Sequence, residues 1–250
     1  MENETQPIPQ AAAPKGGEQK PNPYLVPFAI VVAGIIIAGA VMYTSAPRAG
    51  GGGTTGVRAE QKVNIKDVDT EGEPFIGDAQ APVTLAYWLD FQCPFCQRFD
   101  LQTLPVLVEK YVNTGKLKVV FKDFQFLSED SQTGGFAAHA VWELYPAKYF
   151  EWHTAMFEAQ DEEHAGFGNK ESIIALTRTI SGIDANAISR LMEQKKAEYQ
   201  AEQDADKAEG AKFGVQGTPG FILGTQRVSG AQPVEVFSQL VDAELAKIKK

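Results

Sequence analysis

Cysteine and histidine are scarce in this chain of 250 residues, which contains two cysteines and three histidines. Two cysteines cannot build a disulfide-stapled scaffold, so the only possible internal disulfide joins Cys93 to Cys96. A closed zinc site takes four ligands, and His139, His153 and His164 have no ligand spacing to one another. We interpret the first two as helix-face residues and the third as a loop residue, and we predict no metal site.

Basic residues are outnumbered by acidic ones, 23 against 32, which gives a formal net charge of −9. That balance argues against nonspecific binding of DNA or RNA. Hydrophobic residues make up 44% of the chain and charged residues 22%, which is ordinary for a globular protein. No internal repeat is visible.

Charge is absent from residues 24–43, YLVPFAIVVAGIIIAGAVMY. A helix of that length, at about 1.5 Å per residue, spans about 30 Å, the thickness of a bilayer's hydrocarbon core. A buried core helix would show a polar face, and a signal peptide usually has a shorter apolar region. We therefore predict a retained, single-pass transmembrane helix, although the sequence leaves cleavage open.

The segments that flank this stretch are poor in apolar residues. Residues 1–23 are rich in Pro, Gln, Glu and Ala, which predicts a disordered tail. Residues 44–62 include four consecutive glycines and predict a flexible linker. Basic residues lie on both sides of residues 24–43, so the positive-inside rule does not fix the orientation. The folded domain is predicted to occupy residues 63–250.

The folded part alternates between strand and helix patterns. Residues 83–89 and 117–124 predict two strands, and the apolar positions between them predict a helix with a kink at Pro105. Residues 220–228 have the pattern of a β-hairpin, and residues 234–248 that of a closing helix.

The region between the second strand and the hairpin, about residues 128–213, predicts helices. Its apolar positions give four helical faces, the last of them in a helix that starts near Asp184. Residues 193–213 are charged and Ala-rich, and they predict a solvated helix. The order of elements therefore indicates an α/β core interrupted by a helical insertion.

Cys93 and Cys96 lie directly after the first predicted strand, in the sequence DFQCPFCQRF. Pro94 suits the first position of a helix, which makes Cys93 the N-cap residue. A thiolate there meets the free N–H groups and the positive end of the helix dipole, and both lower its pKa. The spacing brings Cys96 within reach for a disulfide, which a stabilised thiolate makes oxidising. A redox dithiol is thus favoured over a metal site or chance.

Thr218 and Pro219 lie just before the predicted hairpin. A proline at the start of a strand has no ladder N–H to lose, and its peptide bond can be cis. By itself this feature fits an ordinary turn equally well.

Several stretches together resemble the DsbA-like thiol–disulfide oxidoreductases of the thioredoxin superfamily, from about residue 63 to the C-terminus. They are APVTLAYWLDFQCPFCQRF, the helical middle, GVQGTPGFILG and GAQPVEVFSQLVDAEL. The combination of CPFC with a GTP loop around a helical insertion is specific. The resemblance implies a thioredoxin-like fold with that insertion.

The resemblance also implies roles for individual residues. Cys93 corresponds to the exposed nucleophile and Cys96 to the buried resolving cysteine. Pro219 corresponds to a cis-proline opposite the disulfide, and Thr218 precedes it in a loop that pairs with extended substrate. Members commonly act outside the cytoplasmic membrane, which implies a cytoplasmic N-terminus and an extracytoplasmic catalytic domain.

Two positions depart from the family pattern. Many members carry histidine where this chain has Phe95, so its disulfide is expected to be less oxidising than that of the strongest members. Many also carry a buried acid six residues before the first cysteine, where this chain has Tyr87. The nearest acid is Asp90, which fits either a solvated residue that ends the strand or a proton-transfer group for Cys96.

These features predict a membrane-anchored thiol–disulfide oxidoreductase that introduces or exchanges disulfides in extracytoplasmic proteins. We expect it to need no cofactor beyond the cysteine pair, and to depend on a membrane redox partner. A reductase or isomerase of the same fold is the nearest alternative. A non-catalytic membrane-tethered binding module and a metallochaperone are alternatives from other classes. The sequence leaves open the direction of exchange, the substrates, the redox partner and the oligomeric state.

Overall fold

The computed structural model describes residues 63–161 and 165–248, which all belong to one compact unit, Arg58–Lys250. The predicted tail, transmembrane helix and linker lie outside the described residues, as does His164. Among the helices of the described residues, none has the length and apolar character needed to span a membrane.

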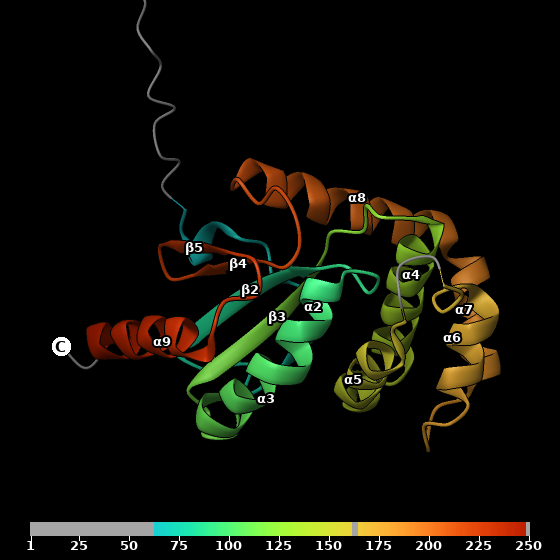
Figure 1. The fold of residues 1–250 in the computed structure, drawn as a ribbon, viewed down its shortest axis with the longest axis horizontal. Helices are drawn as coiled ribbons and strands as arrows, with labels where there is room; N and C mark the ends of the chain where they lie inside the picture. Colours follow the sequence, from blue (N-terminus) through green and yellow to red (C-terminus); the bar gives the residue numbers. More distant parts are fainter. Residues whose placement is uncertain (1–62, 162–164, 249–250) are drawn as a thin grey trace, which may run out of the picture. The chain divides into compact units, whose positions relative to one another are not determined.

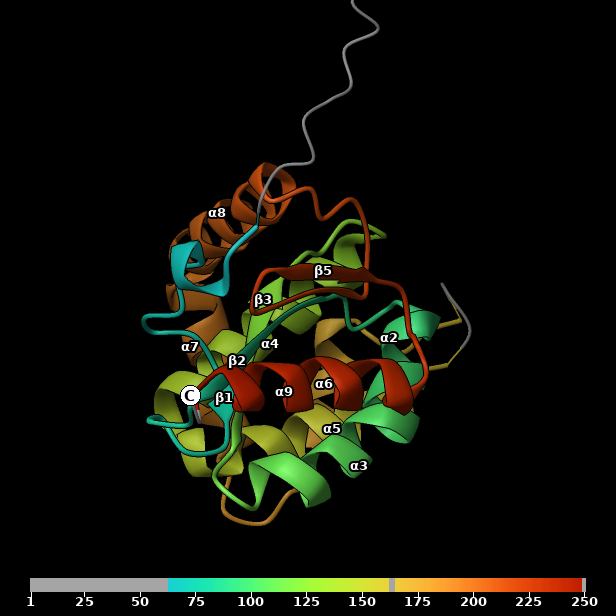
Figure 2. The same cartoon turned by 90° about the vertical axis from the view of Figure 1, so that its left-hand side faces the viewer.

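A five-stranded mixed sheet forms the centre of this unit, with the order β1-β3-β2-β4-β5 (Figures 1 and 2). Its central strand β2 runs parallel to β3 and antiparallel to β4, while β1 and β5 are antiparallel edge strands. The strands are β1 (Phe75–Ile76), β2 (Val83–Leu89), β3 (Leu117–Asp123), β4 (Gly220–Leu223) and β5 (Gln226–Ser229). The predicted strands and hairpin are confirmed. The sequence did not predict β1, because two residues are too few to show the apolar alternation of a strand.

The side chains of β2 alternate between two hydrophobic cores, as the geometry of a strand requires. Leu85 and Tyr87 belong to the larger core, which includes the helix after the cysteine pair and α9 (Val234–Ile248). Ala86 and Trp88 belong to a smaller core on the opposite face. Tyr87 therefore points to the side of the sheet on which Cys96 is buried.

The chain is continuously helical from Pro94 to Val112, as predicted, but its geometry changes along the way. It consists of α2 (Pro94–Arg98), the π-helix η2 (Phe99–Thr103), α3 (Leu104–Leu107) and the π-helix η3 (Val108–Val112). Pro105 lies in the short α3, and the departures from α geometry lie on either side of it. Two apolar residues of this segment, Leu101 and Val106, are exposed by 37% and 42%.

Among the described residues, five α-helices separate β3 from β4 and form the predicted insertion pattern (Figure 1). Asp184 caps α7 by accepting hydrogen bonds from the backbone N–H groups of Asn186 and Ala187. The helices are α4 (Glu129–Leu144), α5 (Tyr149–Ala159), α6 (Lys170–Thr177), α7 (Ala185–Gln194) and α8 (Lys196–Lys212), and a short 3-10 turn, η4 (Pro146–Lys148), lies between α4 and α5. Another 3-10 turn, η1 (Ile65–Asp67), precedes β1.

The predicted solvated helix is wrong for one face of α8. Four of its residues are buried where it packs beside α4 and β3: Tyr199, Gln203, Asp206 and Gly210. The Trp88 indole donates a hydrogen bond to the Asp206 carbonyl oxygen at 3.0 Å. A Cβ at Gly210 would lie 2.9 Å from Trp88 Nε1, so glycine allows this close approach.

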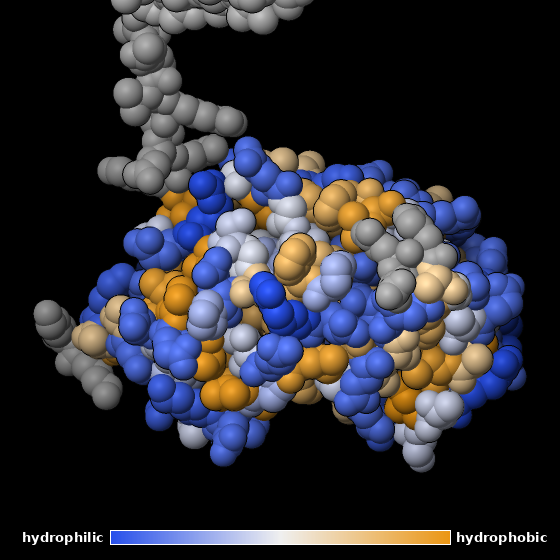
Figure 3. All heavy atoms as spheres, viewed as in Figure 1, coloured by the Kyte–Doolittle hydropathy of each residue, from blue (hydrophilic) through white to orange (hydrophobic). Residues whose placement is uncertain are grey.

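On the face shown in Figure 3, apolar patches lie among hydrophilic side chains. The predicted class, a thioredoxin-like α/β fold with a mixed sheet and helices, is confirmed by the topology.

Candidate active site

Cys93 is the N-cap residue of α2, and Pro94 occupies the first helical position, as the sequence predicted. The backbone N–H of Cys93 donates to the Asp90 carbonyl oxygen at 3.0 Å, which fixes the turn between β2 and the helix. Cys96 follows one turn into the helix, and both cysteines are free thiols.

The two thiols differ less in exposure than the family resemblance implied. Cys93 is 4% exposed and Cys96 is fully buried. The expectation of an exposed nucleophile is therefore wrong for this structure, although Cys93 is the more accessible of the two. Phe95, between them, is 52% exposed and stands at the surface beside the pair.

The Thr218–Pro219 loop lies against Cys93. Its Thr218-Pro219 peptide bond is cis, and the Cys93 thiol donates to the Thr218 carbonyl oxygen at a distance of 3.5 Å. The Pro219 carbonyl oxygen accepts from the Gly230 N–H at 2.8 Å, which ties the loop to the end of β5. The Thr218 hydroxyl is buried and has no hydrogen-bond partner among the described residues, so it is free to donate to a Cys93 thiolate.

The two thiols have opposite pKa shifts. A hydrogen bond from Cys96 has the largest effect on the pKa of Cys93, and it lowers that pKa by more than burial raises it. Donors at Thr218 and in the first helical turn lower it further. Together they lower the pKa of Cys93 to about 6. Burial, reinforced by the neighbouring Cys93, raises the pKa of Cys96 well above its usual range. At neutral pH these shifts favour a thiolate at Cys93 and a protonated thiol at Cys96.

A chain of buried polar groups lies beneath Cys96. Tyr87 is within hydrogen-bonding reach of Cys96, and its hydroxyl donates to Asp100 Oδ2 at 2.5 Å. Asp100 Oδ1 in turn pairs with His153 Nε2 at 2.7 Å. Sequence reasoning singled out Tyr87 but missed Asp100 and its pairing with His153. The helix-face interpretation of His153 is confirmed, since it lies on the buried face of α5.

Asp90 is buried as well, so its interpretation as a solvated residue is wrong. Its carboxylate accepts from the backbone N–H of Gln92 at 2.9 Å, of Phe126 at 3.1 Å and of Leu127 at 3.4 Å. Burial raises its pKa, and these donors oppose the shift. The carboxylate therefore joins the end of β2 to the segment after β3.

Two glutamines connect the insertion to the turn that carries the cysteines. The Gln160 amide donates to the carbonyl oxygens of Phe91 at 2.6 Å and Cys93 at 3.3 Å. The Gln97 amide donates to the carbonyl oxygens of Phe157 at 2.9 Å and Gln160 at 3.2 Å. These bonds fix the first turn of α2 against the end of α5.

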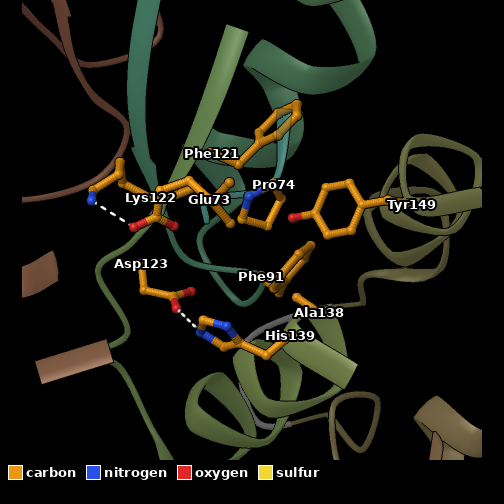
Figure 4. A pocket seen from close by; sticks show the side chains of 10 residues that line it. Glu73, Pro74, Phe91, Phe121, Lys122, Asp123, Ala138, His139 and Tyr149 are labelled. Carbon is orange, nitrogen blue, oxygen red and sulfur yellow. Dashed lines mark hydrogen bonds and ion pairs between the residues drawn. The ribbon is translucent and has the colours of Figure 1, made fainter. Parts of the chain in front are cut away.

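A second cluster of charges lies at the end of β3 (Figure 4). Lys122 Nζ pairs with Glu73 at 2.7 Å, and Asp123 pairs with His139 at 2.5 Å. The cavity between these pairs measures about 10 Å³, room for no more than one water molecule. Among residues 63–161 and 165–248, no group of three or more metal-ligating side chains is placed to hold an ion.

A reduced cysteine pair at a helix start, facing a proline loop on a mixed sheet, defines the class of dithiol redox proteins. The family model described as Thioredoxin matches residues 69–243. The chain belongs to this thioredoxin family, and within it the predicted resemblance to DsbA-like thiol–disulfide oxidoreductases is confirmed.

Three similar proteins illustrate this relationship. Disulfide bond formation protein D of Bacillus subtilis is 22% identical over 175 residues, which cover 70% of this chain and 78% of that protein. The solved structure of oxidised BdbD from the same organism has a TM-score of 0.66 at 20% identity and covers 71% of this chain and 95% of that one. The thiol-disulfide exchange protein α-DsbA2 from Wolbachia pipientis has a TM-score of 0.60 at 26% identity and covers 68% and 86%.

Proposed function

We propose that this protein is a membrane-anchored oxidoreductase that introduces or exchanges disulfides in extracytoplasmic proteins through its CPFC pair. The observation that carries the proposal is the contrast between the two thiols. Cys93 combines a pKa of about 6 with a position at the helix start, whereas Cys96 is buried and holds its proton. A stabilised Cys93 thiolate is a good leaving group, which favours the reduced enzyme and makes its disulfide oxidising.

The exchange proceeds in two steps. A substrate thiolate attacks the Cys93 sulfur of the Cys93–Cys96 disulfide, so a mixed disulfide forms and the electron pair of the broken bond goes to Cys96. A second substrate thiolate then attacks the substrate sulfur, and Cys93 leaves as a thiolate. The substrate dithiol is oxidised to a disulfide, and the enzyme disulfide is reduced to a dithiol.

The Thr218–Pro219 loop is the proposed substrate platform. Its backbone lies against Cys93, where an extended peptide could add to it in the manner of a strand. The exposed Phe95 offers apolar surface next to the nucleophile. Pro94 sets the helix start that stabilises the thiolate.

The same proposal places the protein at the membrane. Residues 24–43 would anchor it, with residues 1–23 in the cytoplasm and the catalytic domain outside, joined by the linker at residues 44–62. The protein would use no metal or organic cofactor, and a membrane redox partner would reoxidise the dithiol. Support for the anchor comes from the uncharged apolar stretch in the sequence.

The test is a redox titration of the catalytic domain together with oxidation of a reduced dithiol peptide. We expect stoichiometric peptide oxidation by the wild type and none by Cys93→Ser. Equal oxidation by the two proteins would contradict the enzyme assignment. A reduction potential near about −270 mV, like that of thioredoxin, would instead identify a reductase.

A further inference from the structure

Tyr87 links the resolving sulfur to a buried acid. Its hydroxyl donates to Asp100 Oδ2 at 2.5 Å. Asp100 follows Cys96 by one turn of the same continuous helix, so this bond places the hydroxyl on the helix face that carries the Cys96 sulfur, and the two groups influence each other's pKa. Asp100 Oδ1 pairs with His153 at 2.7 Å. Asp100 is 4% exposed and the other three side chains are fully buried. A tyrosine hydroxyl both donates and accepts hydrogen bonds, so it can connect the Cys96 thiol to the Asp100 carboxylate.

We propose that Tyr87 transfers a proton between Cys96 and the Asp100–His153 pair during disulfide exchange. In this assignment Tyr87 is a catalytic residue, because it exchanges a proton with a reacting sulfur, while Asp100 and His153 are positioning residues. The proposal rests on the proposed function, since it concerns the exchange step at the same cysteine pair.

The proton transfer accompanies attack by Cys96 on a mixed disulfide at Cys93. The Cys96–Cys93 bond forms, the bond from Cys93 to the substrate sulfur breaks, and the electron pair leaves on the substrate thiolate. The Cys96 proton moves to Tyr87 Oη, and the hydroxyl hydrogen of Tyr87 moves to Asp100 Oδ2. Opening of the disulfide by a substrate thiolate runs the same transfer backwards.

Burial of Cys96 favours such a transfer, because its sulfur has no exposed surface through which water could exchange the proton. The titratable side chains that face it are Cys93 and Tyr87, while Asp90 reaches it through its backbone N–H. Cys93 is the reaction partner, and the Asp90 carboxylate is occupied by three backbone N–H groups. The route through Tyr87 to Asp100 is the one that ends on a carboxylate.

The surroundings of His153 keep this carboxylate in place. The His153 ring lies among the aromatic rings of Phe91, Phe121 and Phe157, with centroid distances of 5.3, 4.4 and 5.1 Å. Its Nδ1 is buried and has no hydrogen-bond partner among the described residues. His153 therefore interacts with the site through Asp100, where Nε2 can share the transferred proton.

The experiment follows release of glutathione from a mixed disulfide at Cys93 in a single turnover, as a function of pH. Tyr87→Phe removes one oxygen, and Asp100→Asn removes the proton acceptor while keeping its shape. Tyr111→Phe is the matched control, because the Tyr111 hydroxyl also donates to a carboxylate, Asp242 at 2.9 Å. We expect both relay variants to release glutathione about 10²–10⁴-fold more slowly at neutral pH. Their rates should rise with pH where the wild-type rate is flat.

Two results have separate meanings. If Tyr87→Phe keeps the rate and pH profile of Tyr111→Phe, the relay is wrong although the exchange function stands. If the wild type forms no mixed disulfide or never releases glutathione, the proposed function itself fails. Should Asp100→Asn not fold, Tyr87→Phe alone decides the question. Alkylation of Cys93 should proceed equally in all the proteins, which excludes loss of the nucleophile as the cause.

Discussion

Phe95 shows how one exposed side chain can adjust the chemistry of a buried pair. Its backbone N–H stabilises the Cys93 thiolate, but its ring offers the sulfur no charge and instead lies 5.1 Å from the Arg98 guanidinium carbon. Because the side chain is 52% exposed, it can be exchanged without disturbing the core. The effect of a substitution should therefore appear in the redox chemistry more than in stability.

We predict that Phe95→His lowers the pKa of Cys93 below its wild-type value of about 6 and makes the disulfide more oxidising. An imidazolium beside the sulfur stabilises the thiolate. Each unit of pKa corresponds to about 1.4 kcal/mol, which for this two-electron couple is about 30 mV. Ultraviolet titration of the thiolate and equilibration with glutathione measure the two quantities.

Phe95→Leu is the control for the lost aromatic ring, because it also removes the contact with Arg98 but adds no charge. It should leave the potential close to that of the wild type. An unchanged or more negative potential in Phe95→His would show that this position does not control the thiolate.

At the residue scale, the sequence predicted the helix start and the cysteine geometry because both depend on adjacent residues. Asp100 also had a local signal, since it follows Cys96 by four positions and so shares its helix face. His153 had none. It reaches Asp100 from 53 positions away, and a histidine among apolar residues has the same sequence pattern whether it is paired or not.

At the element scale, α4 is joined to the end of β3 by a partly buried ion pair. His139 Nε2 contacts Asp123 at 2.5 Å and its Nδ1 contacts Glu202 at 3.0 Å. Burial lowers the pKa of His139, but the two carboxylates outweigh it and raise the pKa to about 10. The imidazolium is therefore present throughout the physiological range and holds the insertion helix to the sheet.

We predict that His139→Gln lowers the free energy of unfolding by about 1–3 kcal/mol at pH 7, because a buried carboxylate loses its charged partner. The pKa is about 6.5 in the unfolded chain and about 10 in the folded one. The stabilisation is thus complete below pH 6.5 and disappears as the pH rises through 10. Denaturant unfolding of both proteins across this range should show the difference between them shrinking towards pH 10.

The buried acids nearby titrate in both proteins, so only the difference between the two pH profiles is informative. Glu151→Gln serves as the control, since Glu151 pairs with Lys148 at 2.8 Å on the exposed surface. Its loss should change stability by less than about 1 kcal/mol at any pH. A constant difference between wild type and His139→Gln from pH 6 to 10 would contradict the assignment of charge.

Element order and type were predictable because apolar spacing is a local property of the chain. The buried face of α8 was not predictable, because the sequence of this helix is charged and Ala-rich throughout. Its burial depends on partners that approach from β2, where Trp88 bonds to the Asp206 carbonyl, and from β3, where Lys122 contacts Asp206 at 2.5 Å. Such long-range pairs leave no periodic trace in the sequence of the helix.

At the scale of the whole molecule, the ionisation of Cys93 couples the redox state of the pair to the stability of the fold. In the reduced protein the folded state lowers the pKa of Cys93 to about 6, whereas an unfolded chain has a thiol pKa of about 8.5. The oxidised protein has no thiol to ionise. The disulfide adds its own constraint on the unfolded chain, but that contribution does not depend on pH.

We therefore predict that the stability of the reduced protein, relative to the oxidised one, increases by about 2 kcal/mol between pH 5 and pH 8. For a thiol with a lowered pKa, the stabilisation is complete above the unfolded value near 8.5 and is lost as the pH falls through about 6. Cys96, whose pKa is raised, opposes this gain only above about pH 8.5. Other groups titrate in both redox forms and cancel.

Urea unfolding of both forms at several pH values measures this difference directly, with a variant that carries Cys93→Ala and Cys96→Ala as the control for the reductant. If the free energies of unfolding of the reduced and oxidised forms change with pH in parallel, the fold does not stabilise the Cys93 thiolate. The oxidising character of the disulfide would then need another origin. We expect the free energy of unfolding of the reduced form, relative to the oxidised form, to begin rising near pH 6, the pKa of Cys93 in the folded protein. That result would show that the interactions that lower the pKa of Cys93 also favour the reduced enzyme.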